Sequence, residues 1–225
     1  MPRRRTDFRG LADPSRVRLL RQVQATPGCT VKALADSTGL HVNTVREHLQ
    51  ALTDEGLVTT EAAHTGGRGR PPTTYRPVVD PAKNRAARER IQQAWEHGDT
   101  LRRILPPNDA TAGLGEAALH QLHPPYQHLD DSGLEPVVDE QQLAVDLVPC
   151  PYYRFLDEDP ELVCAMHGQL IRDTLAQAPG PLRLHELRPF VGPATCIAQL
   201  RHVDDPTNGD LLPTERRTTG QQTAE

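Results

Sequence analysis

Aromatic and sulfur-containing residues are scarce in this 225-residue chain, which has three Phe, four Tyr, one Trp, two Met and four Cys. Only 36% of the residues are hydrophobic, so the composition favours two modest cores over a single large one. No apolar run approaches the roughly 20 residues needed to cross a bilayer, and we expect no membrane partner. The first five residues (MPRRR) lack the apolar stretch of a signal peptide, so we expect a cytoplasmic protein with reduced thiols.

The residue patterns of common enzymes are also missing. The sequence has no C-x-x-C pair, no loop for nucleotide phosphates, and no convincing Ser-His-Asp set or pair of catalytic carboxylates. These absences argue against a thiol redox enzyme or electron carrier, and we predict that the protein is not an enzyme. Four cysteines in a reducing compartment instead favour ligation or redox chemistry over a disulfide framework.

Charge is distributed unevenly along the chain. Residues 1–90 carry 16 Lys/Arg and 9 Asp/Glu, a net charge of +7, whereas the remainder carries 9 and 21, a net charge of −12. A basic front on an acidic body is typical of a nucleic-acid-binding module joined to a separate second domain. The alternative is that these charges only solvate the surface.

Three helices are predicted in succession near the N-terminus. The first begins near Pro14, because a proline is well tolerated in a first helical turn, and it ends at Pro27-Gly28. Thr30 can cap the second helix, and Gly39 supplies a turn before a third helix that begins near Val42. The apolar residues at helical spacing are Val17, Leu20 and Val23, then Val31, Leu34 and Ala35, then Val45, Leu49 and Leu52. This order predicts a helix-turn-helix arrangement.

A hairpin is predicted directly after these helices. Strand-forming residues at 57–60 and 73–78 flank the run 66–72, which is rich in glycine, arginine and proline. Glycine and proline interrupt strands, so the pattern predicts two strands joined by a flexible basic tip. Such a hairpin fits a wing that contacts the sugar-phosphate backbone or the minor groove of DNA.

These segments resemble a known family. Residues 11–20 (LADPSRVRLL) are similar to the opening helix of ArsR-type winged-helix regulators, and 43–49 (NTVREHL) with 55–58 (EGLV) are similar to their recognition helix and first wing strand. Gly69-Arg70-Pro71 with Tyr75 resembles the wing of the branch that contains SufR. The resemblance covers about residues 8–80. It implies a winged helix-turn-helix domain, which we place at residues 1–80, that binds double-stranded operator DNA.

The third helix and the hairpin tip supply the candidate DNA-binding residues. A recognition helix enters the major groove with its N-terminal residues toward the bases, where asparagine can pair with adenine and arginine with guanine. The candidates that face bases or phosphates are therefore Val42, Asn43, Thr44, Arg46 and Glu47. Arg68 and Arg70 are expected to neutralise phosphates. The alternatives are helix capping for Asn43 and Thr44 and a solvated loop for the two arginines.

Residues 81–105 have the apolar spacing of a helix that links the first domain to the rest. In winged-helix regulators such a helix often pairs with its copy in a second subunit. A homodimer also suits an operator with two-fold symmetry. The alternative is a helix that packs within its own chain.

Residues 113–203 are predicted to form a second domain, and residues 204–225 a disordered tail. The predicted elements are a short helix at 116–122, strands at 137–138 and 143–148, a helix from Asp159-Pro160 to about Gln177, and strands at 182–187 and 195–200. Strands around one helix favour a single sheet. The fold class of the chain is therefore expected to be α+β, with a linking or dimerisation helix between the two domains.

Three cysteines of the second domain are candidate metal ligands: Cys150, Cys164 and Cys196. Cys150 follows a predicted strand, Cys164 lies in the first turns of a predicted helix, whose N-terminus should lower the pKa of a thiol, and Cys196 opens a later strand. The spacings C-x13-C and C-x31-C match neither a zinc ribbon nor a ferredoxin run. The alternative is that the cysteines fill gaps in a core. No role is expected for Cys29, in a loop of the first domain, or for His120, His123 and His128.

The segments around these cysteines resemble the C-terminal domain of SufR-type regulators, where three such cysteines bind an iron–sulfur cluster. The resemblance implies a 2Fe-2S or 4Fe-4S cluster on Cys150, Cys164 and Cys196, whose loss or oxidation would change DNA affinity. His167 is the first candidate for a fourth ligand, because it follows Cys164 by three residues, and His185 is the second. The alternative signal is zinc, which thiolates also bind, or a small molecule. We therefore predict a homodimeric transcriptional regulator.

Overall fold

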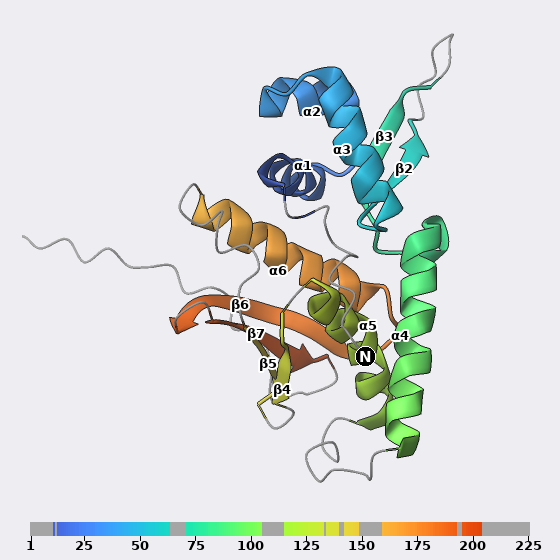
Figure 1. The fold of residues 1–225 in the computed structure, drawn as a ribbon, viewed down its shortest axis with the longest axis vertical. Coiled ribbons are helices and arrows are strands. Elements are labelled where there is room, and N and C mark those ends of the chain that lie inside the picture. Colours follow the sequence, from blue (N-terminus) through green and yellow to red (C-terminus); the bar gives the residue numbers. More distant parts are fainter. Residues whose placement is uncertain are drawn as a thin grey trace, which may run out of the picture.

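The computed structural model of the chain describes residues 11, 13–63, 71–104, 115–132, 134–139, 142–148, 159–192 and 195–203. Its helices are α1 (Pro14–Ala25), α2 (Val31–Thr38), α3 (Val42–Asp54), the 3-10 helix η2 (Pro81–Lys83), α4 (Arg85–Ile104), α5 (Gly115–Asp131) and α6 (Pro160–Ala176). Its strands are β1 (Cys29–Thr30), β2 (Val58–Ala62), β3 (Thr73–Pro77), β4 (Val137–Asp139), β5 (Ala144–Leu147), β6 (Leu182–Gly192) and β7 (Thr195–His202). Helices lie beside two antiparallel sheets (Figure 1), so the fold class is α+β, as the sequence predicts.

The first three helices pack beside a small antiparallel sheet in the order β1-β3-β2. The carboxylate of Asp13 caps α1 by accepting from the Ser15 N–H at 2.8 Å, and the Thr30 hydroxyl caps α2 by accepting from the Ala33 N–H at 3.2 Å. Gly39 ends α2 with φ at 70°, a conformation that glycine adopts without a Cβ penalty. These local signals explain why the three helices lie where the sequence predicts them.

The helix α6 lies between the two hydrophobic cores of the molecule (Figure 1). Its residues Val163, Met166 and Leu170 belong to the core around α1, α2 and α3, which we call the N-terminal core. Its residues Ile171 and Leu175 belong to the core between α5, α6 and the larger sheet, which we call the C-terminal core. One helix of the second half of the chain therefore completes the hydrophobic packing of the first half.

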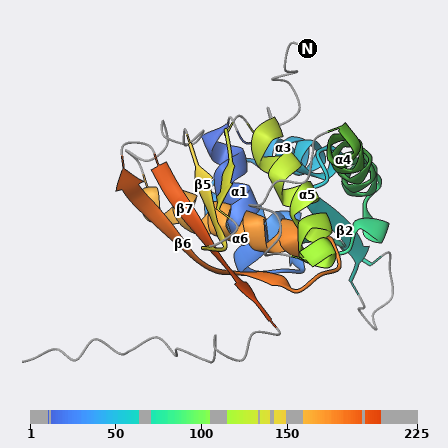
Figure 2. The same ribbon diagram turned by 90° about the horizontal axis from the view of Figure 1, so that it is seen from below.

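The larger sheet has four antiparallel strands in the order β4-β5-β7-β6. The helices α5 and α6 pack on it, and Figure 2 shows α6 crossing behind the strands. In the register of β5 and β7, Leu147 lies opposite Cys196. The four strands confirm the single sheet predicted from the sequence, although β6 extends to Gly192, beyond the predicted end at residue 187.

The helix α5 is longer than the predicted stretch at 116–122, because it continues through Pro124 and Pro125 to Asp131. A proline inside a helix removes one hydrogen bond to the carbonyl four residues earlier. For Pro124 that carbonyl belongs to His120, and it accepts instead from the indole Nε1 of Trp95 in α4, at 3.2 Å. The imidazole of His120 also stacks on Trp95, with ring centroids 4.6 Å apart. The prediction of a short helix was wrong because α4 supplies this replacement donor.

The predicted linking helix is divided by Asn84 into η2 and α4. The side chain of Asn84 accepts from the Ala87 N–H at 3.0 Å and donates to the carbonyl of Thr53 at 2.9 Å, which joins α4 to the end of α3. The apolar face of α4 packs against α5, and a Cβ added to Gly98 would collide with His123. Over residues 85–98, whose burial the structure describes, this face is covered within its own chain, and the homodimer stays a prediction.

Candidate nucleic-acid interface and cysteine site

The helix α3 has an exposed stripe on the side opposite the N-terminal core. Val45, Leu49 and Leu52 are fully buried. The exposed residues, which we call the outward stripe, are Asn43, Arg46, Glu47, Gln50 and Asp54. Their spacing is that of one helix face. The stripe contains three of the five predicted residues of this helix, together with Gln50 and Asp54, which the sequence analysis did not single out.

The start of α3 is capped by His41 rather than by the residues that follow it. The His41 Nδ1 accepts from the Asn43 N–H at 3.2 Å, so the capping alternative for Asn43 and Thr44 is excluded. Val42 is half-buried against the N-terminal core instead of facing outward, and Thr44 is half-buried. A capping histidine is uncommon, and this is why the sequence analysis overlooked it.

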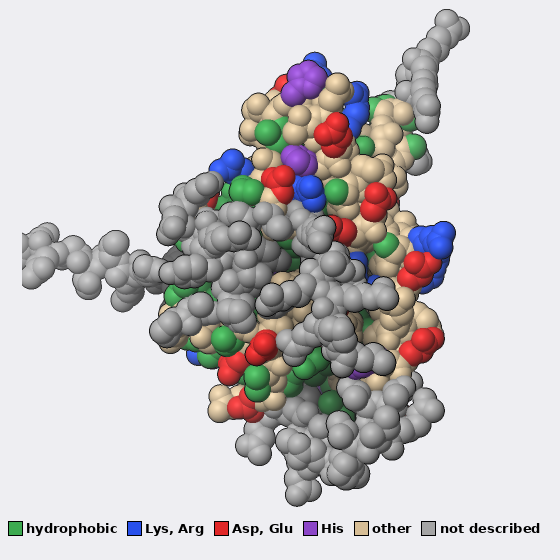
Figure 3. Space-filling view, in the orientation of Figure 1, with side chains coloured by type: hydrophobic (Ala, Val, Ile, Leu, Met, Phe, Trp, Pro, Cys, Tyr) green, Lys and Arg blue, Asp and Glu red, His purple; other side chains and the backbone are tan. Residues whose placement is uncertain are grey.

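Two hydrogen bonds fix side chains around α3. The Arg46 Nη1 donates to the Asn43 Oδ1 at 2.9 Å within the outward stripe. On another side of the helix, the Arg16 Nε of α1 donates to the His48 Nδ1 at 3.3 Å. On the face seen in Figure 3, basic, acidic and histidine side chains are interspersed around α2 and α3. This surface is therefore mixed in charge rather than uniformly basic.

The hairpin β2–β3 is present as predicted, with Val58 opposite Pro77 and Ala62 opposite Thr73. Glu61 on β2 forms ion pairs with Arg76 at 2.9 Å and with Lys83 at 3.0 Å. The hydrogen bond from Lys83, more than any other effect, lowers the pKa of Glu61. The two arginines predicted to contact phosphates, Arg68 and Arg70, lie outside the described residues.

A family model for a helix-turn-helix domain matches residues 11–61. The match begins at residue 11, three residues before α1, runs into β2 and includes the outward stripe. Residues 11–61 form a helix-turn-helix domain. No curated protein and no solved structure matches the chain.

The helix-turn-helix domain supports the prediction of a DNA-binding transcriptional regulator. Domains of this family belong to regulators that are generally not enzymes. Among the helices that the structure describes, none combines the length and the apolar character needed to cross a membrane. The match agrees with the predicted resemblance to ArsR-like winged-helix regulators, whereas the resemblance to the SufR-like branch stays a prediction.

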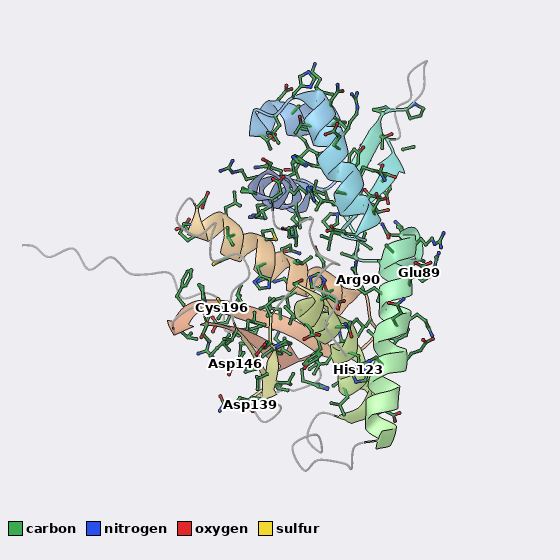
Figure 4. The ribbon with its side chains drawn as sticks, in the orientation of Figure 1. Glu89, Arg90, His123, Asp139, Asp146 and Cys196 are labelled. Carbon is green, nitrogen blue, oxygen red and sulfur yellow. The ribbon has the colours of Figure 1, made fainter. Side chains whose placement is uncertain are left out.

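The structure describes two of the three candidate cysteines. Cys164 is half-buried in the second turn of α6, Cys196 is 4% exposed on β7, and Cys150 lies outside the described residues. Cys196 lies on the sheet below α6, far from the contact of α4 with α5 marked by His123 (Figure 4). Burial raises the pKa of the Cys164 thiol, and the charge of Cys196 raises it further. The two thiols are therefore within electrostatic reach of each other.

The expectation that the helix N-terminus lowers the pKa of Cys164 was wrong, because burial, followed by the charge of Cys196, raises it. Cys29 also differs from expectation: it lies in strand β1 opposite Tyr75, rather than in a loop, and is 8% exposed. Burial raises the pKa of its thiol. Its place in the N-terminal core agrees with the absence of any assigned role.

Neither candidate fourth ligand completes a metal-binding group with the described cysteines. His167 is buried, which lowers its pKa to about 4. Burial also lowers the pKa of His128 on α5, followed by the charges of Arg90 and His167. His185 is exposed on β6. Among the described residues, no group of three or more His, Cys, Asp or Glu side chains is placed to hold a metal ion. A site on Cys164 and Cys196 therefore requires a residue outside those ranges, such as Cys150.

A buried carboxylate on α6 gives a pH-dependent prediction. Asp173 is 6% exposed, and burial raises its pKa from 3.8 to about 6, although Gln169 donates a hydrogen bond to it at 2.9 Å. Because the folded-state pKa lies above the unfolded one, stability is lost as the pH rises through this interval. Asp173→Asn should therefore raise the free energy of unfolding by on the order of 3 kcal/mol at pH 7.5.

This gain should shrink as the pH falls through 6 and vanish below about 4, where both states of the parent are protonated. Urea unfolding of both proteins at pH 7.5, 6 and 4.5 measures it. Leu175→Ala, an apolar change in the C-terminal core on the same helix, should give a difference that does not vary with pH. A constant difference for Asp173→Asn would contradict the prediction.

Proposed function

We propose that the protein is a homodimeric transcriptional regulator that binds operator DNA through α3 and the β2–β3 hairpin. We further propose that Cys150, Cys164 and Cys196 hold an iron–sulfur cluster that modulates this binding. The observation that carries the proposal is the position of α6. The same helix bears Cys164 and contributes Val163, Met166 and Leu170 to the core of the helix-turn-helix domain.

The outward stripe supports the DNA-binding surface. Asn43, Arg46 and Glu47 lie in the first turns of α3, which is the end of a recognition helix that approaches base edges. Arg68 and Arg70 at the hairpin tip would contact phosphates. Since α5 packs against α4, the proposed homodimer would use a surface that this contact leaves open. Light scattering of the purified protein measures its mass.

The donor atoms support a soft metal centre. Thiolates prefer iron–sulfur clusters and zinc to hard cations, and Cys164 and Cys196 lie on neighbouring elements within electrostatic reach. Cys150 follows Leu147, the partner of Cys196 in the sheet, by three residues, and three residues span at most about 10 Å. The chain is thus short enough to bring the third thiol to the same end of the sheet.

The helix α6 offers a route from the cysteines to DNA. A bound cluster would supply iron–thiolate bonds that tie α6 to β7 and that oxidation can break. Cys164 lies one residue from Val163, which packs in the N-terminal core. The amide of Gln24 in α1 also donates to the Met166 carbonyl at 3.3 Å. A shift of α6 would therefore move α1, which packs directly on α3.

Purification without air tests the cluster. The parent should be brown and contain iron and sulfide. Cys164→Ser and Cys196→Ser should each bind iron with an affinity at least about tenfold lower, since loss of even a supporting residue lowers metal affinity by about 10–100-fold. Cys29→Ser is the matched control, because this cysteine is buried like Cys196 but lies in the N-terminal core. Iron, sulfide and zinc quantification with an absorption spectrum gives the result.

Each outcome separates the alternatives. Zinc without sulfide would support the zinc-responsive regulator, and a colourless, metal-free parent would reject the metal centre and leave a small molecule as the signal. Operator binding measured with and without the metal then shows whether the centre modulates DNA affinity.

A further inference from the structure

We infer that Asn43 is a positioning residue that orients Arg46 toward a guanine of the operator, instead of reading an adenine itself. This inference rests on the proposed binding of DNA by α3. It assigns different roles to two residues that are both exposed in the first turns of that helix.

The hydrogen bond between the two side chains carries the inference. The Asn43 Oδ1 accepts from the Arg46 Nη1 at 2.9 Å, and the residues are three positions apart, so they share one helix face. An asparagine that reads adenine needs both its carbonyl oxygen and its amide, one for each base atom. One of the two lone pairs of the Asn43 Oδ1 already accepts from Arg46, so the orientation of this amide is set by Arg46 before a base is met.

The charge of the outward stripe favours base reading by Arg46. Arg46 is the only basic residue of the stripe, which also contains the carboxylates of Glu47 and Asp54. A face built to neutralise phosphates would carry several cations, whereas a single oriented arginine suits the two acceptors of guanine. Bond formation to Asn43 restricts the long side chain of Arg46 before DNA arrives, which lowers the entropy lost on binding.

The wing strand also lies close to Arg46. Tyr75 of β3 packs partly against the N-terminal core. Burial raises the pKa of its phenol, and the charge of Arg46 opposes this rise. The guanidinium of Arg46 therefore lies within electrostatic reach of Tyr75, a residue that packs partly against the N-terminal core.

Selection from a random DNA duplex library tests the inference with the full-length protein. The parent should enrich a motif with a guanine at one position in each half-site. Arg46→Ala should lower the preference for that guanine by roughly 5- to 150-fold, the range for a bidentate contact. Asn43→Ala should weaken the preference at the same position, and Asn43→Asp, which keeps the acceptor oxygen, should retain it.

The matched control is Gln92→Ala, because Gln92 is also exposed and donates to a carboxylate four residues later, that of Glu96 at 2.9 Å, but lies on α4, outside the outward stripe. It should leave the guanine preference unchanged. The inference would be overturned if Asn43→Ala lost a preference for adenine at a different position of the motif. It would also be overturned if Asn43→Asp changed the preferred base to cytosine. Either result would show that residue 43 reads a base directly. A parent that enriches no sequence would overturn DNA reading by α3 altogether.

Discussion

Met166→Ala is expected to lower the free energy of unfolding by about 2–5 kcal/mol, the range for large-to-alanine changes in a core. Met166 is fully buried, and it packs in the N-terminal core although it belongs to the second half of the chain. The cavity would lie beside α1, whose Gln24 contacts the Met166 carbonyl. We therefore expect the loss of stability to be greatest around α1 and to weaken DNA binding.

Leu175→Ala is the matched control for this prediction. Leu175 is 1% exposed on the same helix, but it packs in the C-terminal core. Denaturant unfolding should show similar losses for the two variants. Native-state hydrogen exchange should differ, with faster exchange of the α1 amides in Met166→Ala and faster exchange in the larger sheet in Leu175→Ala. Equal exchange of α1 in both variants would show that α6 does not support the helix-turn-helix domain.

Gln121→Leu is expected to lower the free energy of unfolding by at least about 3 kcal/mol, because it leaves three buried backbone groups without their partners. The Gln121 Nε2 donates to the carbonyls of Leu175 at 3.1 Å and Leu182 at 3.0 Å. Its Oε1 accepts from the Leu182 N–H at 2.7 Å. This one fully buried side chain therefore joins α5 to the end of α6 and to the start of β6.

Gln127→Leu makes the same substitution on the same helix and serves as the control. The Gln127 amide donates only to Asp131, four residues later, at 2.8 Å, and we expect a change within about 0.5 kcal/mol. Urea unfolding followed by circular dichroism measures both. If the two variants were equally stable, the hydrogen bonds of Gln121 would not contribute to stability as their burial indicates.

Local signals account for the success of the sequence analysis at the N-terminus. A proline in the first turn of α1, a capping threonine before α2 and a glycine at φ 70° after it each act within a few residues. The inward positions Val45 and Leu49 follow from periodicity alone. Such features are determined by the chain next to them, so they can be read without knowledge of the fold.

The errors arose where distant segments decide the outcome. Pro124 and Pro125 indicate the end of a helix, but α5 continues, and the indole of Trp95 supplies the donor that Pro124 lacks. The pKa of Cys164 depends on burial under the fold rather than on its place in α6. Val42 satisfies the spacing of a DNA-facing residue but packs inward. Periodicity gives the face of a helix, whereas tertiary packing decides how far that face is covered.

The shared helix α6 also limits how the chain can be divided. A fragment that ended at residue 80 would keep every element of the winged helix but would lose Val163, Met166 and Leu170. Its α1 would then present apolar surface to water, which favours aggregation. We expect that this DNA-binding end cannot be grafted onto a foreign effector domain unless a substitute for α6 is grafted with it.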